Sequence, residues 1–171
     1  MQLILLRHPP ALGAAGLCYG RLDIEADPAQ IDASAAAVAA WPGLPVFTSP
    51  ARRCLALAQR LHPAPQIIPG LQELDFGRWE GVRWDDVPRA ELDAWAADIW
   101  HYRPGGGESA AMLLARWQRL VARWQAADVE RAVVVSHAGV IRMALAEAGL
   151  IAEAARWDWP VEYARAYVIE V

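Results

Sequence analysis

Residues 2–8 read Gln-Leu-Ile-Leu-Leu-Arg-His, and residues 131–137 read Arg-Ala-Val-Val-Val-Ser-His. Each stretch contains a short continuous apolar run, which is typical of a strand buried on both faces of a sheet. Each run ends in polar residues, and the first is followed by two prolines, which cannot continue a central strand. Ligands of open α/β sheets bind at the carboxyl ends of strands. We therefore expect His8 and His137 to meet at one edge if their strands are parallel neighbours.

Strands and helices alternate along the rest of the chain. Apolar runs predict further strands over 45–48, 66–68 and 164–171. Cap signals and helical spacing predict helices over 27–40, 51–61, 88–100, 108–126 and 140–148. Asp27-Pro28 and Ser49-Pro50 each combine an N-cap residue with proline in the first turn. The alternation predicts an α/β fold: a single-domain three-layer α/β/α sandwich over 1–171 with a mostly parallel sheet.

The composition is that of one globular domain. Of 171 residues, 56% are hydrophobic, so we expect one sizeable core, and the net charge of -4 argues against a nucleic-acid partner. No apolar run reaches the ~20 residues that span a bilayer, and no signal peptide is evident, so we expect no membrane partner and a cytoplasmic location. Cys18 and Cys54 fit neither a disulfide framework nor a zinc motif. Trp157 and Trp159 fit either the core or a homodimer surface.

A pair of imidazoles can bind a metal, act as a general base or act as a nucleophile. Phosphoryl transfer suits this pair because its transition state spreads negative charge over oxygens that guanidinium forks match. Arg7 precedes His8, and Arg53 lies in the first turn of a predicted helix, where anions are favoured. All 16 basic residues are arginine, so any anion site here uses guanidinium. A metal site needs a third ligand at suitable spacing, and none is evident, so metal chemistry stays the alternative.

Residues 71–81 of the predicted loop over 69–88 carry three carboxylates among apolar residues: Glu73, Asp75 and Glu80. Long loops within a compact domain are usually functional. A leaving alkoxide needs a proton from an acid, and a carboxyl in apolar surroundings can supply it. The pattern of residues leaves the choice among the three carboxylates open.

Five segments, in order along nearly the whole chain, resemble the motifs of the histidine phosphatase (phosphoglycerate mutase-like) superfamily. They are Leu5 to His8, Thr48 to Arg53, Leu71 to Gly81, Gly106 to Ser109 and Val133 to Arg142. The resemblance implies one histidine phosphatase domain over 1–171 that hydrolyses phosphomonoesters with no metal and no cofactor. His8 would be the nucleophile that forms a phosphohistidine. Arg7, Arg53 and His137 would hold the phosphoryl oxygens, and Glu73 matches the proton donor.

Within this family, residues 16–23 resemble a segment of α-ribazole phosphatases, which act in cobalamin biosynthesis. The resemblance implies a small phosphorylated metabolite as partner, either α-ribazole 5′-phosphate or a similar ester. The chain lacks the long insertions of phosphoglycerate mutases, which favours hydrolysis. The candidate substrate-pocket residues are Tyr19, Arg21, Asp23, Trp79 and Glu80.

The chain also departs from the family pattern near His8. Pro9 replaces a glycine and offers no backbone N–H to phosphate. Ala11 and Ala14 stand where relatives often have Thr and Asn. A catalytically weakened, phosphate-binding or regulatory member therefore stays an alternative, as does a phosphoglycerate mutase-type phosphotransferase.

Overall fold

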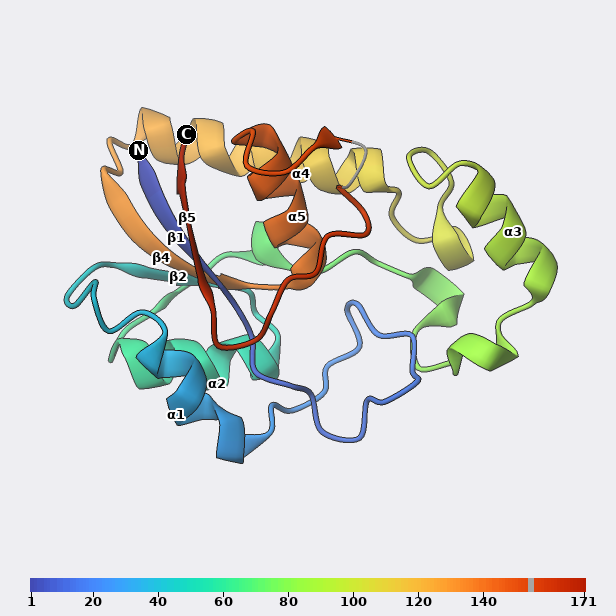
Figure 1. The fold of residues 1–171 in the computed structure, drawn as a ribbon, viewed down its shortest axis with the longest axis horizontal. Helices are drawn as coiled ribbons and strands as arrows, with labels where there is room; N and C mark the ends of the chain where they lie inside the picture. Colours follow the sequence, from blue (N-terminus) through green and yellow to red (C-terminus); the bar gives the residue numbers. More distant parts are fainter. Residues whose placement is uncertain (154–155) are drawn as a thin grey trace.

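The computed structural model describes residues 1–153 and 156–171, with a five-stranded sheet between helices (Figure 1). The strands are β1 (Gln2–Arg7), β2 (Val46–Thr48), β3 (Gln66–Ile67), β4 (Arg131–Ser136) and β5 (Ala166–Glu170). Their order is β3-β2-β4-β1-β5. The first four strands run parallel, and β5 pairs antiparallel with β1 at the edge. The predicted α/β sandwich with a mostly parallel sheet is confirmed.

Helices cover both faces of this sheet (Figure 1). On one face lie α1 (Ile31–Ala36) and α2 (Arg52–Leu61), and on the other lie α4 (Ala110–Ala126) and α5 (Ala138–Glu147). The fifth helix, α3 (Arg89–Ala97), lies to the side of the sheet (Figure 1). Side chains alternate between the faces of a strand. Leu3 and Leu5 of β1 therefore join the core under α4 and α5, whereas Ile4 and Leu6 join the core under α2. Within the described ranges, every helix is too short or too polar to span a bilayer.

The two predicted N-cap signals act differently from their prediction. Asp27 accepts a hydrogen bond from Ala29 N, but it opens a 3-10 turn, and the α1 helix that follows ends at Ala36 rather than at residue 40. Ser49 was expected to cap α2, and this prediction is wrong, because Ala51 is the N-cap residue and makes no side-chain cap. The Ser49 hydroxyl lies instead within hydrogen-bond distance of His137.

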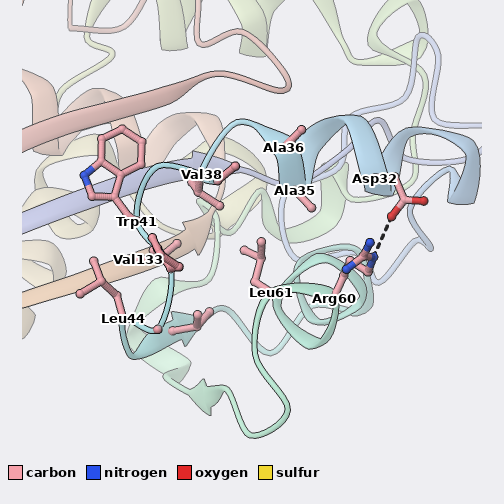
Figure 2. Close-up of a pocket in the computed structure, with 13 residues that line it drawn as sticks. Asp32, Ala35, Ala36, Val38, Trp41, Leu44, Arg60, Leu61 and Val133 are labelled. Carbon is pink, nitrogen blue, oxygen red and sulfur yellow. Dashed lines mark hydrogen bonds and ion pairs between the residues drawn. The ribbon is translucent and has the colours of Figure 1, made fainter.

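A cavity of about 330 Å³ lies between α1, the end of α2 and the sheet (Figure 2). Its walls include Val38, Leu61 and Val133, and an Asp32–Arg60 ion pair of 2.7 Å lies on its α1 side. None of the candidate site residues from the sequence lines it. This cavity is therefore separate from the place where the two histidines meet.

Candidate active site

His8 and His137 leave the sheet at the same edge. Their strands are parallel neighbours in register, with Arg7 opposite Ser136, and His8 N donates to Ser136 O at 3.0 Å. The two imidazole centroids lie 5.1 Å apart, and His8 is only 3% exposed. The expectation that the strand ends bring the two histidines together is confirmed.

The surroundings of His8 select one tautomer. Its Nδ1 lies 2.6 Å from the carbonyl oxygen of Pro9, which only accepts, so Nδ1 carries the hydrogen and Nε2 keeps its lone pair. Arg53 Nε donates to that Nε2 at 3.3 Å. Burial, and next the charge of Arg53, lower the pKa of His8 from 6.5 to about 3, although the Pro9 bond opposes this. His8 is therefore neutral near pH 7, with its lone pair at Nε2.

Arg53 fixes the opposite tautomer in His137. It is fully buried in the first turn of α2 and donates to the carbonyls of Gly20 and Leu22. Its Nη2 lies 3.2 Å from His137 Nδ1, which must accept, so His137 Nε2 carries the hydrogen and donates to Ser49 Oγ at 2.8 Å. Burial above all, and also neighbouring charges such as Arg53, hold the pKa of His137 well below 6.5. Both imidazoles are therefore neutral.

Two further arginines line the same cavity. Arg7 donates to Val161 O at 2.7 Å and lies over the ring of Tyr163. Its Nε is buried and has no hydrogen-bond partner in the described part of the chain. Arg142 of α5 donates from Nε to Trp159 O at 2.7 Å. The sequence prediction did not single out Arg142, although it closes the segment that begins at Val133, and helical spacing after His137 was the signal that could have found it.

Among the carboxylates of the 69–88 segment, Glu73 lines the cavity that His8 and His137 share. Its Oε2 accepts from Gly139 N at 2.9 Å, in the first turn of α5, and its Oε1 accepts from Leu74 N at 3.0 Å. A Cβ at position 139 would overlap the Glu73 carboxyl, so glycine is needed there. Asp75 and Glu80 line neither this cavity nor the one beside it. Of the three carboxylates among which the sequence pattern left the choice open, Glu73 is the one that lines the cavity.

The cavity has a charged end and an apolar wall. Its volume is about 240 Å³, and three arginines and one carboxylate line it together with the two histidines. The apolar and aromatic wall consists of Leu17, Tyr19, Leu74, Phe76, Trp84 and Trp157. The excess of positive charge suits a phosphate dianion, and the wall suits a flat or apolar group attached to it.

Three of the predicted pocket residues lie at these cavities. Tyr19 lines the main cavity, and Arg21 and Asp23 line a neighbouring one that also touches Glu73 and His137. Trp84 and Trp157 in the main cavity were not in the predicted set. They lie far apart in the sequence, and only the fold brings them together.

Trp79 and Glu80 were predicted in the pocket, and the structure corrects both. Trp79 is 2% exposed and packs in the core, where its Nε1 donates to Glu91. The Glu80 carboxylate accepts from the backbone N–H of four residues: Gly20, Arg21, Leu22 and Phe76. Its oxygens join the loop after β1 to the loop that carries Glu73, so its role is structural.

Comparison with known proteins assigns the class. Residues 3–171 match the histidine phosphatase superfamily (branch 1), and the chain belongs to this family. It is 34% identical over 113 residues to the adenosylcobalamin/alpha-ribazole phosphatase of Escherichia coli (strain K12), covering 63% of this chain and 55% of the relative. It is 30% identical over 117 residues to the enzyme of the same name from Salmonella typhimurium (strain LT2), and this match covers 66% of this chain and 58% of the relative. The matched part spans little more than half of these relatives.

A solved structure extends the likeness to the whole fold. The crystal structure of the alpha-ribazole phosphatase from Shigella flexneri superposes with a TM-score of 0.87. The match covers 100% of this chain and 91% of that one at 24% sequence identity. At this identity the likeness shows a shared fold.

Proposed function

We propose that this chain hydrolyses phosphomonoesters through a phosphohistidine at His8. The observation that carries the proposal is the state of His8: neutral, with Nδ1–H held by the Pro9 carbonyl and the Nε2 lone pair at the cavity. A nucleophile must be unprotonated, and the fixed tautomer keeps the lone pair on Nε2. Arg53 Nε donates to that lone pair at 3.3 Å and must turn to the phosphoryl oxygens before attack. The cluster of Arg7, Arg53 and Arg142 supports a phosphoryl group as the electrophile.

In the first step, the Nε2 lone pair of His8 forms a bond to phosphorus. The ester P–O bond breaks, its electron pair stays on the leaving oxygen, and that oxygen takes a proton from the Glu73 carboxyl. His8 now bears the phosphoryl group on Nε2 and a hydrogen on Nδ1, and therefore a positive ring. The Pro9 carbonyl, 2.6 Å from Nδ1, stabilises that charge.

In the second step, water replaces the imidazole. Glu73, now a carboxylate, takes a proton from water as the water oxygen bonds to phosphorus. The N–P bond breaks and its electron pair returns to Nε2, so phosphate leaves and His8 and Glu73 regain their starting states. We propose that Arg7, Arg53 and Arg142, which line the cavity, hold the phosphoryl oxygens during both steps. His137 would join them by turning its Nε2–H from Ser49 Oγ to a phosphoryl oxygen.

For the substrate, we propose α-ribazole 5′-phosphate or a similar small phosphate ester. The names of the Escherichia coli and Salmonella relatives point to it. Support from the chain itself comes from the aromatic wall, where Tyr19, Trp84 and Trp157 can contact a planar ring system. We further propose that the protein is cytoplasmic, has no nucleic-acid or membrane partner, and forms a homodimer. Light scattering of the purified chain measures the last of these.

Turnover of α-ribazole 5′-phosphate, nucleoside monophosphates and sugar phosphates, with release of inorganic phosphate, tests the proposal. The wild-type chain should hydrolyse at least one ester, and His8→Ala should abolish it. No three His, Cys, Asp or Glu side chains among residues 1–153 and 156–171 form a group that could hold a metal ion, so EDTA should leave the rate unchanged. Equal turnover by His8→Ala overturns the proposal, and loss of activity in EDTA points to a metal enzyme.

A phosphate-binding member of the family with weak catalysis is the second candidate. Two observations favour it: Arg53 already donates to Gly20 O and Leu22 O, and Pro9 has no N–H to offer to phosphate. It predicts binding of inorganic phosphate without turnover of any ester. A mutase would isomerise a phosphorylated sugar acid in the presence of a bisphosphate and release little phosphate. The turnover screen separates all three.

A further inference from the structure

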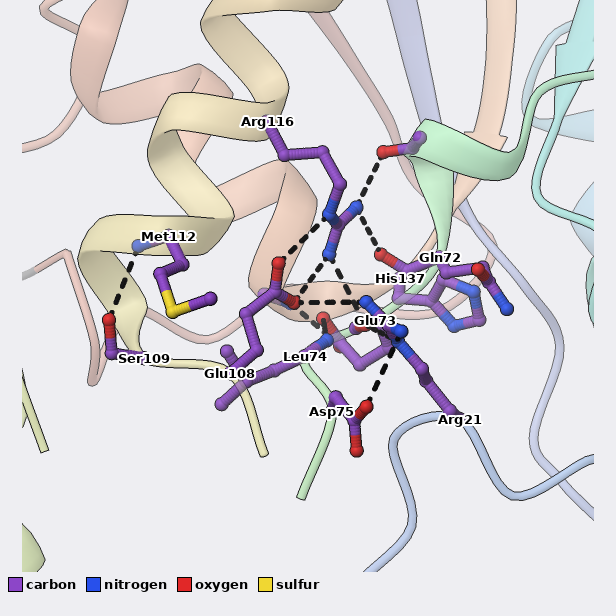
Figure 3. Close-up of polar contacts among 12 residues, drawn as sticks. Arg21, Gln72, Glu73, Leu74, Asp75, Glu108, Ser109, Met112, Arg116 and His137 are labelled. Carbon is purple, nitrogen blue, oxygen red and sulfur yellow. Dashed lines mark hydrogen bonds and ion pairs between the residues drawn. The ribbon is translucent and has the colours of Figure 1, made fainter. Parts of the chain in front are cut away.

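Arg116 of α4 lies outside the cavity and binds the backbone that leads to Glu73 (Figure 3). Its Nη1 donates to the carbonyl oxygens of Gly70 and Gln72, the latter at 2.8 Å. Its Nη2 donates to the carbonyl oxygen of Glu73 at 3.3 Å. One guanidinium therefore holds three carbonyls within four residues of the segment.

Glu108 fixes the orientation of that guanidinium. Its Oε1 accepts from Arg116 Nε at 3.1 Å and its Oε2 accepts from Nη2 at 2.8 Å, which is a two-point contact. The two side chains are 13% and 9% exposed, so water competes little for them. Glu108 is itself held, because its N–H donates to Asp75 O at 2.7 Å and Ser109 caps α4 next to it. The pair thus joins α4 to both sides of Glu73.

The position of the Glu73 carboxyl depends on this backbone. Within the described part of the chain, that carboxyl is bonded only by the backbone N–H groups of Leu74 and Gly139. The close approach to Gly139 leaves no room to shift towards α5. Proton transfer is sensitive to misplacement of this kind, and an error of about 1 Å can cost roughly 100-fold in rate. The main chain of Glu73 must therefore be held in place to within about 1 Å. The Arg116 hydrogen bonds to this backbone hold it.

We infer that Arg116, oriented by Glu108, is a positioning residue for proton transfer to the leaving oxygen by Glu73. The inference rests on the proposed function of this site. It gives a role to Glu108, which lies in the Gly106 to Ser109 motif. Arg21 adds a weaker contact to the same unit, 3.4 Å from Glu108 Oε2 and 3.4 Å from Asp75 Oδ2.

A pair of aryl esters isolates this role. 4-Nitrophenyl phosphate has a good leaving group that needs little help from an acid, whereas phenyl phosphate has a poor one. Arg116→Gln should lower kcat/KM for phenyl phosphate about 10- to 100-fold more than for 4-nitrophenyl phosphate, as expected for a misplaced general acid. Arg119→Gln, on the exposed side of the same helix, is the matched control and should leave the ratio of the two rates unchanged.

A double-variant cycle with Glu73→Gln completes the test. If Arg116 acts through Glu73, adding Arg116→Gln to Glu73→Gln should cause no further leaving-group-dependent loss. If Arg116→Gln does not fold, the double variant Arg116→Met with Glu108→Leu removes both charges together and takes its place. A uniform loss on both esters, or additive losses in the cycle, overturns the inference. Absence of turnover by the wild-type chain instead overturns the proposed function.

Discussion

His8 and His137 have opposite tautomers because their neighbours differ. A carbonyl accepts from Nδ1 of His8, whereas the Arg53 guanidinium donates to Nδ1 of His137. Only His8 therefore has its lone pair on Nε2. Pro9 removes a backbone N–H, as the sequence indicates, yet its carbonyl is the group that orients His8. The His137 tautomer follows from a contact 84 residues away, and the His8 tautomer from the way the chain turns the adjacent Pro9 carbonyl back to the ring, so a list of residue types predicts neither.

The low pKa of His8 has a direct kinetic consequence. Because it is about 3, His8 stays neutral, and so nucleophilic, from pH 8 down to about pH 4. We expect kcat/KM, corrected for the ester's own ionisation near pH 6, to show no decline from protonation of a histidine around pH 6.5. Initial rates between pH 4.5 and 8 give the profile. A corrected acidic limb centred near 6.5 would contradict this state of His8.

Gly139 is the second residue with a sharp prediction. A methyl group at this position overlaps the Glu73 carboxyl, so Gly139→Ala should move that carboxyl out of place. We expect kcat/KM for a poor leaving group to fall on the order of 100-fold. Glu73→Gln combined with Gly139→Ala should be no slower than Glu73→Gln alone. An additive loss in the double variant would mean that Gly139→Ala damages the site by another route.

Among the elements, β1 and β4 were the most predictable. Each is a run of apolar residues that ends at a polar one, and their pairing places His8 beside His137. The 69–88 segment was less predictable because its carboxylates have different environments in the folded chain. Glu73 reaches the cavity, whereas Glu80 bonds backbone N–H groups, and the two have similar surroundings in the sequence. Hydrogen-bond partners that are some 60 residues away decide between these roles.

Glu80 provides a prediction about the two loops it joins. Glu80→Ala removes the acceptor for four backbone N–H groups, two of them partly shielded from water. We expect the free energy of unfolding to fall by about 2 kcal/mol, measured by urea denaturation. Activity should fall as well, because Gly20 and Leu22 hold Arg53 through their carbonyls. Glu130→Ala, at an exposed position, is the control. An equal fall in the free energy of unfolding in this control would contradict the role given to Glu80.

The whole molecule should lose stability as the pH falls through 6.5, because both cavity histidines are buried in their neutral form. In the unfolded chain they take up protons below pH 6.5, whereas folded His8 does so only near pH 3 and folded His137 also well below 6.5. The unfolded state binds more protons in this window, so stability rises with pH there. Between pH 7 and 5.5 we expect a loss of about 1 kcal/mol for each histidine.

Urea denaturation at the two pH values measures this loss. His8→Gln and His137→Gln should each remove about half of the pH dependence. Arg119→Gln, which replaces an exposed residue and no histidine, should leave it unchanged. A stability that is flat between pH 7 and 5.5 in the wild-type chain would show that the cavity histidines take up protons without opposing folding.

At the same scale, the substrate wall was the least predictable part of the site. Its residues come from three segments that meet only in the folded molecule: Leu17 from the first, Phe76 and Trp84 from the 69–88 segment, and Trp157 from the third. Arg142 was missed for a related reason, since helix α5 begins directly after His137, two residues earlier than predicted. The family motifs identify the residues at the charged end of the cavity. The loops between strands and helices form its apolar and aromatic wall.

The proposed reaction passes through a phosphohistidine at His8, and this intermediate can be trapped. The protein is mixed with a turned-over ester, quenched in alkali within milliseconds, digested, and analysed by mass spectrometry. We expect one acid-labile phosphoryl group on the peptide that contains His8, absent from His8→Ala and accumulating in Glu73→Gln with 4-nitrophenyl phosphate. Hydrolysis without phosphorylated His8 at any time, or a phosphoryl group on another residue, would contradict the account.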